Sequence, residues 1–284
     1  MMKIGFIGAG KVGFSLGKYF CEHHLDVTGY YSKNLQSAKE AAVFTDTMYF
    51  EDIESIVRSS DTLFLTVPDG AIGEVWSSIK KLPIQNKIIC HCSGSLSSAV
   101  FSEIDHCQSY GYSVHPLFAF SDKRNSYKEL SGVFFTLEGS KERLNEVKML
   151  LEKLGNPVQV ISAENKPIYH CAAVYVSNFM VALAQIGIDL LVDCGFRENE
   201  AASALNPLLM GNVKNIVKQG PTNALTGPIE RSDIGTVSGH LAHLTGSQKE
   251  LYILLSRKLM EIAKKKNPAR NYDGLENLLR GEQS

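Results

Sequence analysis

The sequence predicts an α/β protein in which a doubly wound parallel sheet of the Rossmann type is followed by an all-α domain. Three observations support this fold class. A short apolar strand at the N-terminus runs into the motif GxGxxG and then into a helical stretch. Apolar runs of strand length then alternate with helical patterns up to residue 162, as in parallel sheets that helices cover on both faces. After that point only helical patterns follow.

The expected elements follow in order along the chain. Strands are expected at residues 3–7, 26–31, 61–67, 87–92, 112–115, 133–137 and 158–161. Between them, helices are expected at residues 11–23, 35–42, 71–79 and 141–154. Beyond them, helices are expected at residues 167–192, 198–218, 233–244 and 248–265, before a polar tail that is ordered only in part. We therefore place a dinucleotide-binding domain at residues 1–163 and a helical substrate and dimerisation domain at residues 164–284.

The composition is that of a soluble globular protein. The chain has 284 residues, of which 44% are hydrophobic, and a net charge of −1, which favours neither nucleic acid nor an anionic membrane as a partner. Its six cysteines show no CxxC spacing, and on a strand Cys90 and Cys92 would point away from His91, so no metal site is expected. We expect a cytoplasmic protein, because the N-terminus runs straight into a strand without an export signal.

Residues 171–192 are apolar enough to raise the question of a membrane span. They include Ser177, Asn178, Gln185 and Asp189, which are poorly suited to hydrocarbon, so we expect a buried helix and no membrane partner. A helix that is apolar on most sides needs more cover than a small helical domain provides. We therefore expect a homodimer formed through this domain.

The motif GAGKVG directly follows the first strand and opens a helix, which is the setting that a dinucleotide-binding turn requires. Gly8 permits a tight turn, Gly10 lets the backbone approach a pyrophosphate, and Gly13 lets the helix pack closely on the strand. The helix N-terminus favours the phosphates. The alternative is a glycine-rich turn without a ligand. The expected cofactor contacts of this turn are Gly8, Ala9, Gly10, Lys11, Val12 and Gly13.

The end of the second strand favours NADP(H) over NAD(H). NAD-binding sites usually place an acidic residue there, which binds the ribose 2′-hydroxyl. Here Tyr31 stands in that place, and Ser32, Lys33 and Asn34 follow, so a hydroxyl, an ammonium and an amide could bind a 2′-phosphate. The alternative for Lys33 is a solvated loop lysine.

Further candidates lie at the carboxyl ends of the next strands, where ligands bind in open α/β sheets. Val67, Pro68 and Asp69 should border the cofactor, although Asp69 could instead cap the following helix. Ser93 should lie where nicotinamide and substrate meet. His115 is a substrate-binding candidate in SVHPLFAF, with a structural histidine as the alternative.

The segment ENKPIYHCAAVYVSN, residues 164–178, combines an apolar helix with four polar side chains. Lys166 and His170 lie about 40° apart around a helix, His170 and Ser177 about 20°, and Asn178 falls on the same half. A polar stripe on an apolar helix turns toward a cleft or toward a buried polar network. We favour the cleft, with His170 or Lys166 as proton donor, and with Asn178 and Ser177 holding the reacting oxygen or a substrate hydroxyl.

A second polar cluster lies in LTGPIERSD, residues 225–233. Arg231 is suited to binding a substrate carboxylate, because its planar guanidinium donates two parallel hydrogen bonds. Asp233 is a further candidate for substrate binding and could equally cap the next helix. The alternative for the whole cluster is a loop held by a salt bridge.

The motifs HCSGSL, VHPLFAF, YHCAAVYVSN and LTGPIERSD together extend over most of the chain. With its N-terminal Rossmann domain and helical C-terminal domain, the chain resembles the β-hydroxyacid dehydrogenase superfamily. More closely, it resembles the Rossmann-like family whose C-terminal domain was long of unknown function. The resemblance implies an NADPH-dependent oxidoreductase. Some members of that family resemble an alternative class of ketopantoate reductase, which implies a step in pantothenate biosynthesis.

The resemblance is incomplete at one catalytic position. Many superfamily members place a lysine four residues before an asparagine on the first helix of the second domain. Asn178 matches the asparagine, but Val174 stands at the lysine position, so His170 or Lys166 would take its role. The expected function is NADPH-dependent reduction of a small 2-oxo acid, with ketopantoate as the leading substrate. The alternatives are another reductase, acting on a prephenate-type or pyrroline-carboxylate-type substrate, and a non-catalytic NADP(H)-binding sensor.

Overall fold

The structure of the protein is a computed structural model that describes residues 2–281. The chain divides into two compact units, Met1–Ser177 and Asn178–Ser284. The first unit holds the sheet and the helix α6 (Lys166–Val176). The domain boundary predicted at residue 163 marks the end of the strand-forming part of the chain. In the structure α6 belongs to the first unit, because its first residue, Lys166, is buried against the sheet.

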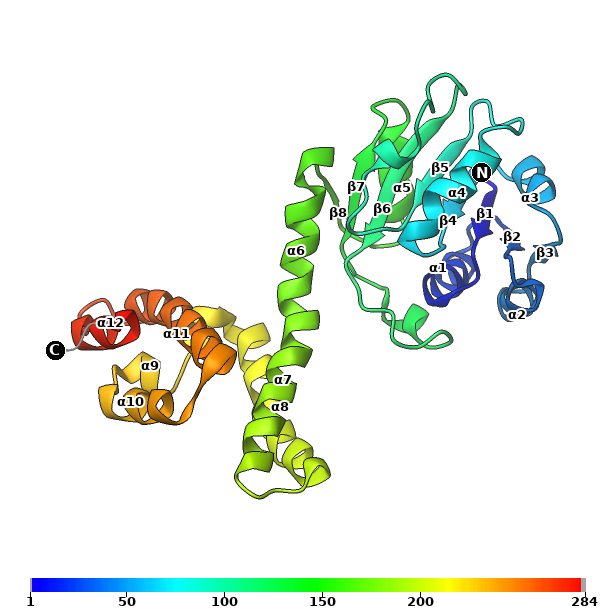
Figure 1. The fold of residues 1–284 in the computed structure, drawn as a ribbon. Coiled ribbons are helices and arrows are strands. Elements are labelled where there is room, and N and C mark those ends of the chain that lie inside the picture. Colours follow the sequence, from blue (N-terminus) through cyan, green and yellow to red (C-terminus); the bar gives the residue numbers. More distant parts are fainter. Residues whose placement is uncertain (1, 282–284) are drawn as a thin grey trace. The chain divides into compact units, whose positions relative to one another are not determined.

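The first unit is built on one sheet of eight strands in the order β3-β2-β1-β4-β5-β6-β7-β8 (Figure 1). The strands are β1 (Ile4–Ile7), β2 (Val27–Tyr31), β3 (Met48–Phe50), β4 (Thr62–Leu65), β5 (Ile88–His91), β6 (Tyr110–Pro116), β7 (Phe135–Gly139) and β8 (Val158–Val160). The predicted doubly wound sheet is confirmed, with one correction: β7 pairs antiparallel with β6. The connection of residues 117–134 holds a short 3₁₀ turn, Ser126–Glu129, but no α-helix to cross over a face of the sheet, which a parallel return usually uses.

Helices cover both faces of this sheet, as a doubly wound fold requires. One face is covered by α1 (Lys11–Glu22), α2 (Leu35–Thr45) and α5 (Leu144–Glu152), and the other by α3 (Ile53–Ser59) and α4 (Asp69–Ile79). Every residue of β1, β4 and β5 is therefore buried. This burial on both faces explains why these strands are continuous apolar runs in the sequence.

Two elements of the first unit were not predicted. Strand β3 has only three residues, and Met48 and Tyr49 are exposed at the edge of the sheet, so it lacks the pattern of a covered strand. Helix α3 is short, and Asp52 caps it by accepting a hydrogen bond of 2.7 Å from the backbone N–H of Ser55.

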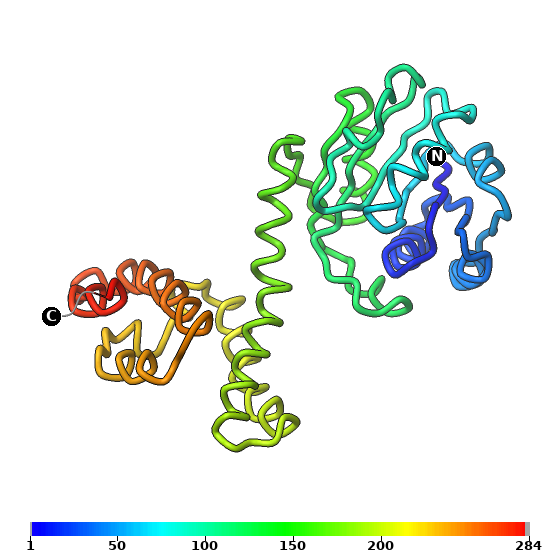
Figure 2. The backbone as a smooth tube through the Cα atoms, in the orientation of Figure 1, coloured from blue at the N-terminus to red at the C-terminus, as the bar shows by residue number. Residues whose placement is uncertain are grey.

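The described residues of the second unit form helices only. They are α7 (Asn178–Asp193), α8 (Glu198–Ala224), α9 (Pro228–Arg231), α10 (Ile234–His243), α11 (Gly246–Lys266) and α12 (Asp273–Arg280). The long helices α7 and α8 pack as an antiparallel pair, and α8 is broken at Gly220, whose φ is +77° (Figures 1 and 2). The tail that was expected to be only partly ordered contains α12, because Leu275 and Leu279 are buried in the core of α9–α12.

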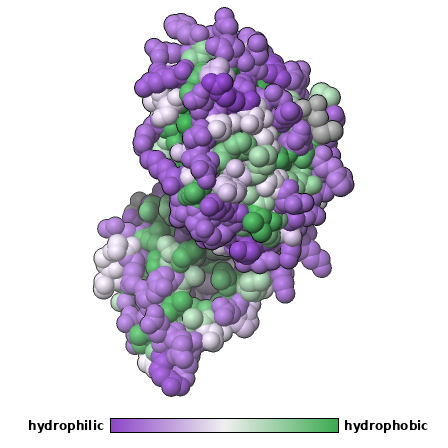
Figure 3. Space-filling model, turned by 90° about the vertical axis from the view of Figure 1, so that its right-hand side faces the viewer, coloured by the Kyte–Doolittle hydropathy of each residue, from purple (hydrophilic) through white to green (hydrophobic). Residues whose placement is uncertain are grey.

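The predicted burial of residues 171–192 is wrong for the single chain. Large apolar side chains are exposed on both α7 and α8. Figure 3 shows such apolar surface in green among hydrophilic residues. The helical segment Ala163–Asp193 is also long and apolar enough, by length and composition, to cross a membrane. The exposed apolar residues of α7 and α8 are Phe179, Met180, Val181, Leu183, Val192, Leu208, Leu209, Met210, Ile216 and Val217.

The cysteines differ strongly in their access to solvent. Burial raises the pKa of Cys21 to about 11 and that of Cys92 to about 12. These two are therefore thiols rather than thiolates at neutral pH. The free cysteines are Cys90, which is buried, Cys21, Cys92 and Cys107, which are partly buried, and Cys171 and Cys194, which are exposed.

Candidate active site

The glycine motif forms the turn between β1 and α1, at the point where the strand order of the sheet reverses. Gly8 has a φ of +113°, and a Cβ there would lie 2.8 Å from the backbone of Thr66. A Cβ on Gly13 would lie 2.3 Å from the carbonyl oxygen of Gly8. Only glycine fits these two positions, because backbone atoms fill the space that a side chain would need.

Gly10 differs from the other two glycines, because a Cβ there would meet no atom within 4 Å. It is the N-cap residue of α1, and among residues 2–281 no side chain caps this helix. The space beside Gly10 at the start of α1 is therefore open, and an anion there is favoured by the helix dipole. The turn therefore has room for a pyrophosphate group, and its binding there stays a prediction.

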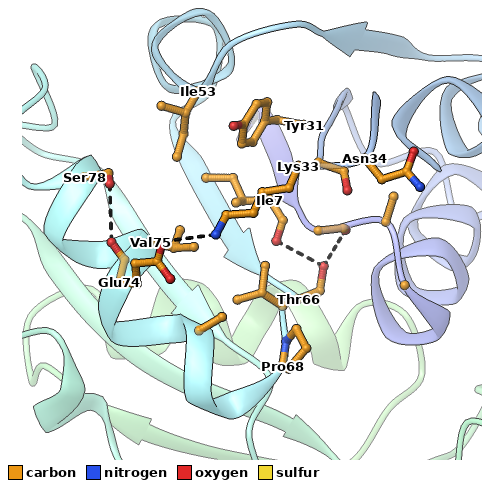
Figure 4. A pocket seen from close by; sticks show the side chains of 16 residues that line it. Ile7, Tyr31, Lys33, Asn34, Ile53, Thr66, Pro68, Glu74, Val75 and Ser78 are labelled. Carbon is orange, nitrogen blue, oxygen red and sulfur yellow. Dashed lines mark hydrogen bonds and ion pairs between the residues drawn. The ribbon is translucent and has the colours of Figure 1, made fainter. Parts of the chain in front are cut away.

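A cavity of about 380 Å³ lies beside this turn in the first unit (Figure 4). Ile53, Val75 and Tyr31 give one end an apolar lining suited to an adenine ring, while Gly8 and Gly10 line the phosphate end. The residues predicted at the end of β2 and at the end of β4 both reach this cavity. They are Tyr31, Ser32, Lys33 and Asn34 at the end of β2, and Val67 and Pro68 after β4.

The polar residues at the end of β2 have different partners. Asn34 caps α2 through its Oδ1, which accepts a hydrogen bond of 3.0 Å from the backbone N–H of Gln36. The Nζ of Lys33 lies 3.0 Å from Oε1 of Glu74 on α4, and both side chains are exposed. Lys33 is therefore the side chain with the mobility and charge to bind a 2′-phosphate.

Lys33→Glu is expected to shift coenzyme preference from NADPH toward NADH. The substitution places a second carboxylate beside Glu74 and removes the ammonium, so a 2′-phosphate would be repelled. The ratio of the two dissociation constants, measured by coenzyme fluorescence, should change by about tenfold or more. An unchanged ratio would contradict the assignment of Lys33 to the phosphate.

Asp69 does not cap α4, because Pro68 is the N-cap residue and Asp69 is the first residue of the helix. Its Oδ2 instead accepts hydrogen bonds from the hydroxyls of Ser93, at 2.7 Å, and Ser95, at 3.0 Å. The carboxylate therefore fixes the loop after β5 to the start of α4. His91 holds the same loop, since its Nδ1 accepts from the backbone N–H of Ser93 at 3.2 Å.

Lys166 is almost fully buried at the start of α6. Its Nζ donates hydrogen bonds to the carbonyl oxygen of Ser93, at 2.8 Å, and to Oγ of Ser113 on β6, at 2.7 Å. An ammonium has three N–H bonds, and two of them are used here. The described part of the chain offers no hydrogen-bond acceptor to the third, so it is left for a ligand. Burial lowers the pKa of Lys166 to about 8, against the raising effect of the Glu138 and Asp69 carboxylates.

His115 and His170 approach the same point beside Gly94. A Cβ on Gly94 would lie 2.7 Å from Nδ1 of His170 and 2.9 Å from Nε2 of His115. The Nδ1 of His170 is buried and has no hydrogen-bond partner among residues 2–281. His115 is held by Tyr169, whose hydroxyl lies 2.7 Å from its Nδ1, and burial lowers the pKa of His115 to about 3. His115 is therefore a neutral imidazole at neutral pH.

The structure thus brings Lys166, His170, His115 and Ser93 together within the first unit. The hydroxyl of Ser177 donates to the carbonyl oxygen of Ala173, at 2.7 Å. This hydrogen bond is internal to α6, so it does not place the hydroxyl at the site.

The remaining predicted site residues belong to the second unit. Asn178 begins α7, and Arg231 ends α9 with an exposed side chain. Asp233 caps α10, with its Oδ1 accepting a hydrogen bond of 3.0 Å from the backbone N–H of Thr236. From the sequence, capping a helix was one of two roles considered for Asp233, and the structure shows this role.

Three residues of the site were missed from the sequence. Ser113 lies two positions before His115 on β6, so the two-residue period of a strand could have placed both on one face. Tyr169 directly precedes His170. The role of its hydroxyl could not be predicted, because its partner His115 comes close only in the folded chain. Glu74 on α4 carries no local signal, because it is an ordinary exposed helix residue until the fold brings it to Lys33.

Two family models match the sequence. Residues 3–93 match a family described as NADP oxidoreductase, coenzyme F420-dependent. Residues 133–259 match a domain of unknown function (DUF2520). The first match covers the glycine turn and the strands β1–β5, and it confirms the predicted NADP(H) cofactor. The pair of matches supports the predicted combination of an oxidoreductase domain with a C-terminal domain that long had no assigned function.

Solved structures are similar to this chain over at least 92% of its length. A protein from Thermotoga maritima is 28% identical, with a TM-score of 0.73, over 93% of this chain and 99% of that one. A proposed NADP oxidoreductase from Bacteroides fragilis is 24% identical, with a TM-score of 0.72, over 92% and 98% of the two chains. A reductive aminase from Aspergillus terreus in complex with NADPH is 13% identical, with a TM-score of 0.62, over 98% and 99%.

The latter two likenesses show the fold alone. No curated protein matches the sequence. The chain has the fold of NADP-dependent oxidoreductases.

Proposed function

We propose that the protein is an NADPH-dependent reductase of a small 2-oxo acid, with ketopantoate as the leading substrate. The observation that carries the proposal is the buried ammonium of Lys166, held by Ser93 and Ser113 beside two imidazoles. These groups come from the loop after β5, the end of β6 and the start of α6, in the unit that also holds the dinucleotide turn. A buried cation with one unused N–H bond suits a substrate that develops negative charge.

The reaction needs a proton at the oxygen of the ketone. When bound, NADPH supplies a hydride for the ketone carbon. Lys166 is then the preferred proton donor, because a pKa of about 8 keeps it protonated at neutral pH and makes it a stronger acid than an ordinary lysine. His170 is the second candidate, since its unpartnered Nδ1 lies at the same loop.

His115 is suited to binding the reacting oxygen rather than to protonating it. In this proposal the Tyr169 hydroxyl donates to Nδ1, so that the proton of the neutral ring lies on Nε2, the nitrogen nearest to Gly94. Nε2–H is then available to donate a hydrogen bond. The predicted roles of Asn178 and Ser177 toward a substrate hydroxyl, and of Arg231 toward the carboxylate, belong to the same proposal.

Turnover is expected to fall as pH rises above the pKa of Lys166, which is about 8. The lysine must be protonated to donate a proton, so deprotonation at higher pH removes the active form. The measurement is kcat with saturating NADPH and substrate between neutral and alkaline pH. A kcat that rises steadily across this range would exclude Lys166 as the donor.

The substrate is tested by following NADPH oxidation with purified protein. Ketopantoate is compared with pyruvate and 2-oxoisovalerate, and pyrroline-5-carboxylate serves as the imine alternative. Selective turnover of ketopantoate supports the proposal. Selective turnover of pyrroline-5-carboxylate would replace it by imine reduction, and tight NADPH binding without any turnover would favour a sensor.

We further propose that a second copy of the chain covers the apolar side chains of α7 and α8. A membrane is the weaker occupant, because α7 carries an exposed polar pair in which Gln185 Nε2 donates to Asp189 Oδ1 at 2.8 Å. Such groups are costly in hydrocarbon, whereas protein interfaces accept them at their rim.

Val181→Glu is expected to convert the dimer to a monomer. Val181 is 71% exposed on α7, and a buried carboxylate at an apolar interface is costly. The matched control is Val43→Glu on α2, where the side chain is 85% exposed in the first unit and no change of mass is expected. The mass is measured by light scattering. A monomeric wild type, or a protein recovered only with detergent, would contradict the proposed dimer.

A further inference from the structure

Glu74 lies on the opposite side of the coenzyme cavity from the end of β2. It projects from α4, and its Oε1 meets the Nζ of Lys33 at 3.0 Å across the cavity (Figure 4). Among the described residues that line this cavity, Glu74 is the single carboxylate and Lys33 the single cationic side chain. The two opposite charges therefore meet at the place where they can compete for one ligand group.

The position of this pair corresponds to the ribose of the coenzyme. Ile53 and Tyr31 lie toward one end of the cavity in Figure 4, and the glycine turn lines the phosphate end, so the ribose would lie between them. In an NAD site an acidic residue at the end of the second strand accepts a hydrogen bond from the 2′-hydroxyl. Tyr31 stands at that position here, which leaves Glu74 as the acceptor that the cavity provides.

We propose that Lys33 and Glu74 form a selector for the coenzyme, in which Lys33 binds the 2′-phosphate of NADP(H) and Glu74 accepts the 2′-hydroxyl of NAD(H). The chain then binds both coenzymes, and Glu74 makes the preference of the chain for NADPH over NADH smaller. The inference rests on the proposed function only for its coenzyme site and not for the substrate.

The physical reason is competition for the ammonium. A 2′-phosphate carries up to two negative charges, so it is attracted by Lys33 and repelled by Glu74, which lies beside Nζ and already accepts one of its three N–H bonds. A neutral hydroxyl leaves the ion pair in place and adds one hydrogen bond to the carboxylate. Both side chains are largely exposed, so the exchange of partners costs little and depends on salt.

The test is the dissociation constants of NADPH and NADH, measured by titration calorimetry with the full chain and without substrate. Glu74→Gln should strengthen NADPH binding by about three- to tenfold and weaken NADH binding by a few-fold, because the repulsion and the charged acceptor are both removed. The gain of Glu74→Gln in preference for NADPH over NADH should become smaller as the salt concentration is raised, since exposed charges are screened.

The matched control is Glu103→Gln. Glu103 forms an exposed ion pair of 2.7 Å with Lys80, next to the end of the same helix α4, but it does not line the cavity. This variant should leave the ratio of the two dissociation constants unchanged. If Glu74→Gln also leaves the ratio unchanged, or changes both constants by the same factor, the selector is refuted.

The outcomes also separate the selector from the proposed reaction. A chain that binds both coenzymes with the expected response to Glu74→Gln, yet reduces no 2-oxo acid, would refute the substrate and retain the selector. If the chain reduces ketopantoate, but Glu74→Gln leaves the ratio of the NADPH and NADH dissociation constants unchanged, only the selector is refuted.

Discussion

Lys166→Met is expected to lower kcat for the reduced substrate by about 100-fold or more, as loss of a general acid does. Methionine has a similar length but neither a charge nor a hydrogen-bond donor, so the position can no longer protonate an alkoxide. NADPH binding should be nearly unchanged, because Lys166 contacts Ser93 and Ser113 rather than the glycine turn. The measurements are steady-state kcat and the dissociation constant of NADPH.

The fold should tolerate this change. The carbonyl oxygen of Ser93 and the hydroxyl of Ser113 lose a donor, at a cost of about 1–3 kcal/mol. The variant also removes a buried charge, which offsets part of that cost. The thermal midpoint therefore serves as the check that the loss of activity is chemical and not a loss of folded protein.

His170→Ala is the companion variant, because His170 is the alternative donor. It should lower kcat more than it weakens NADPH binding, but by less than Lys166→Met if Lys166 is the acid. The alkaline fall of kcat should persist in His170→Ala. A wild-type kcat in Lys166→Met together with a large loss in His170→Ala would transfer the donor role to His170.

Gly10→Ala is expected to weaken NADPH binding by about tenfold or more, which is about 1.4 kcal/mol or more, without destabilising the protein. Gly10 has a φ of −79°, which any residue adopts, and its added methyl group would meet no protein atom within 4 Å. The methyl group would instead occupy the space that a pyrophosphate needs. Coenzyme titration and a thermal melt are the two measurements.

Gly13→Ala gives the contrasting result. Its methyl group would lie 2.4 Å from the hydroxyl oxygen of Thr66 and even closer to the Gly8 backbone, so the turn itself must move. Overpacking of this kind costs about 1–3 kcal/mol, and the melting temperature should fall. If Gly10→Ala retains wild-type affinity for NADPH, the phosphate does not lie on this turn.

The sheet of the first unit was predictable because its information is local. Strands covered on both faces must be apolar throughout, and the segments that became β1, β4 and β5 could be recognised by that property alone. Edge strand β3 lacks this constraint, since water covers much of its surface. The direction of β7 was missed because strand direction depends on the connection and not on the residues within the strand.

The candidate site was predictable only in part, for a related reason. The glycine turn is a local motif, so its position followed from spacing. Lys166 was recognised as a candidate, but nothing in its sequence neighbourhood indicated that the ammonium is buried, because the groups that hold it are 53 and 73 residues away. The partnership of Glu74 with Lys33 depends in the same way on α4 and β2 being brought together.

The uneven burial of the cysteines makes the native chain suitable for spectroscopic labelling. Thiol reagents attack thiolates, so the partly buried Cys21 and Cys92, with their raised pKa values, should react slowly. Cys171 on α6 and Cys194 just after α7 are exposed, and each lies in a different unit. A pair of spin labels on these two native residues would report the distance between the units, and its change when NADPH binds, without an engineered cysteine.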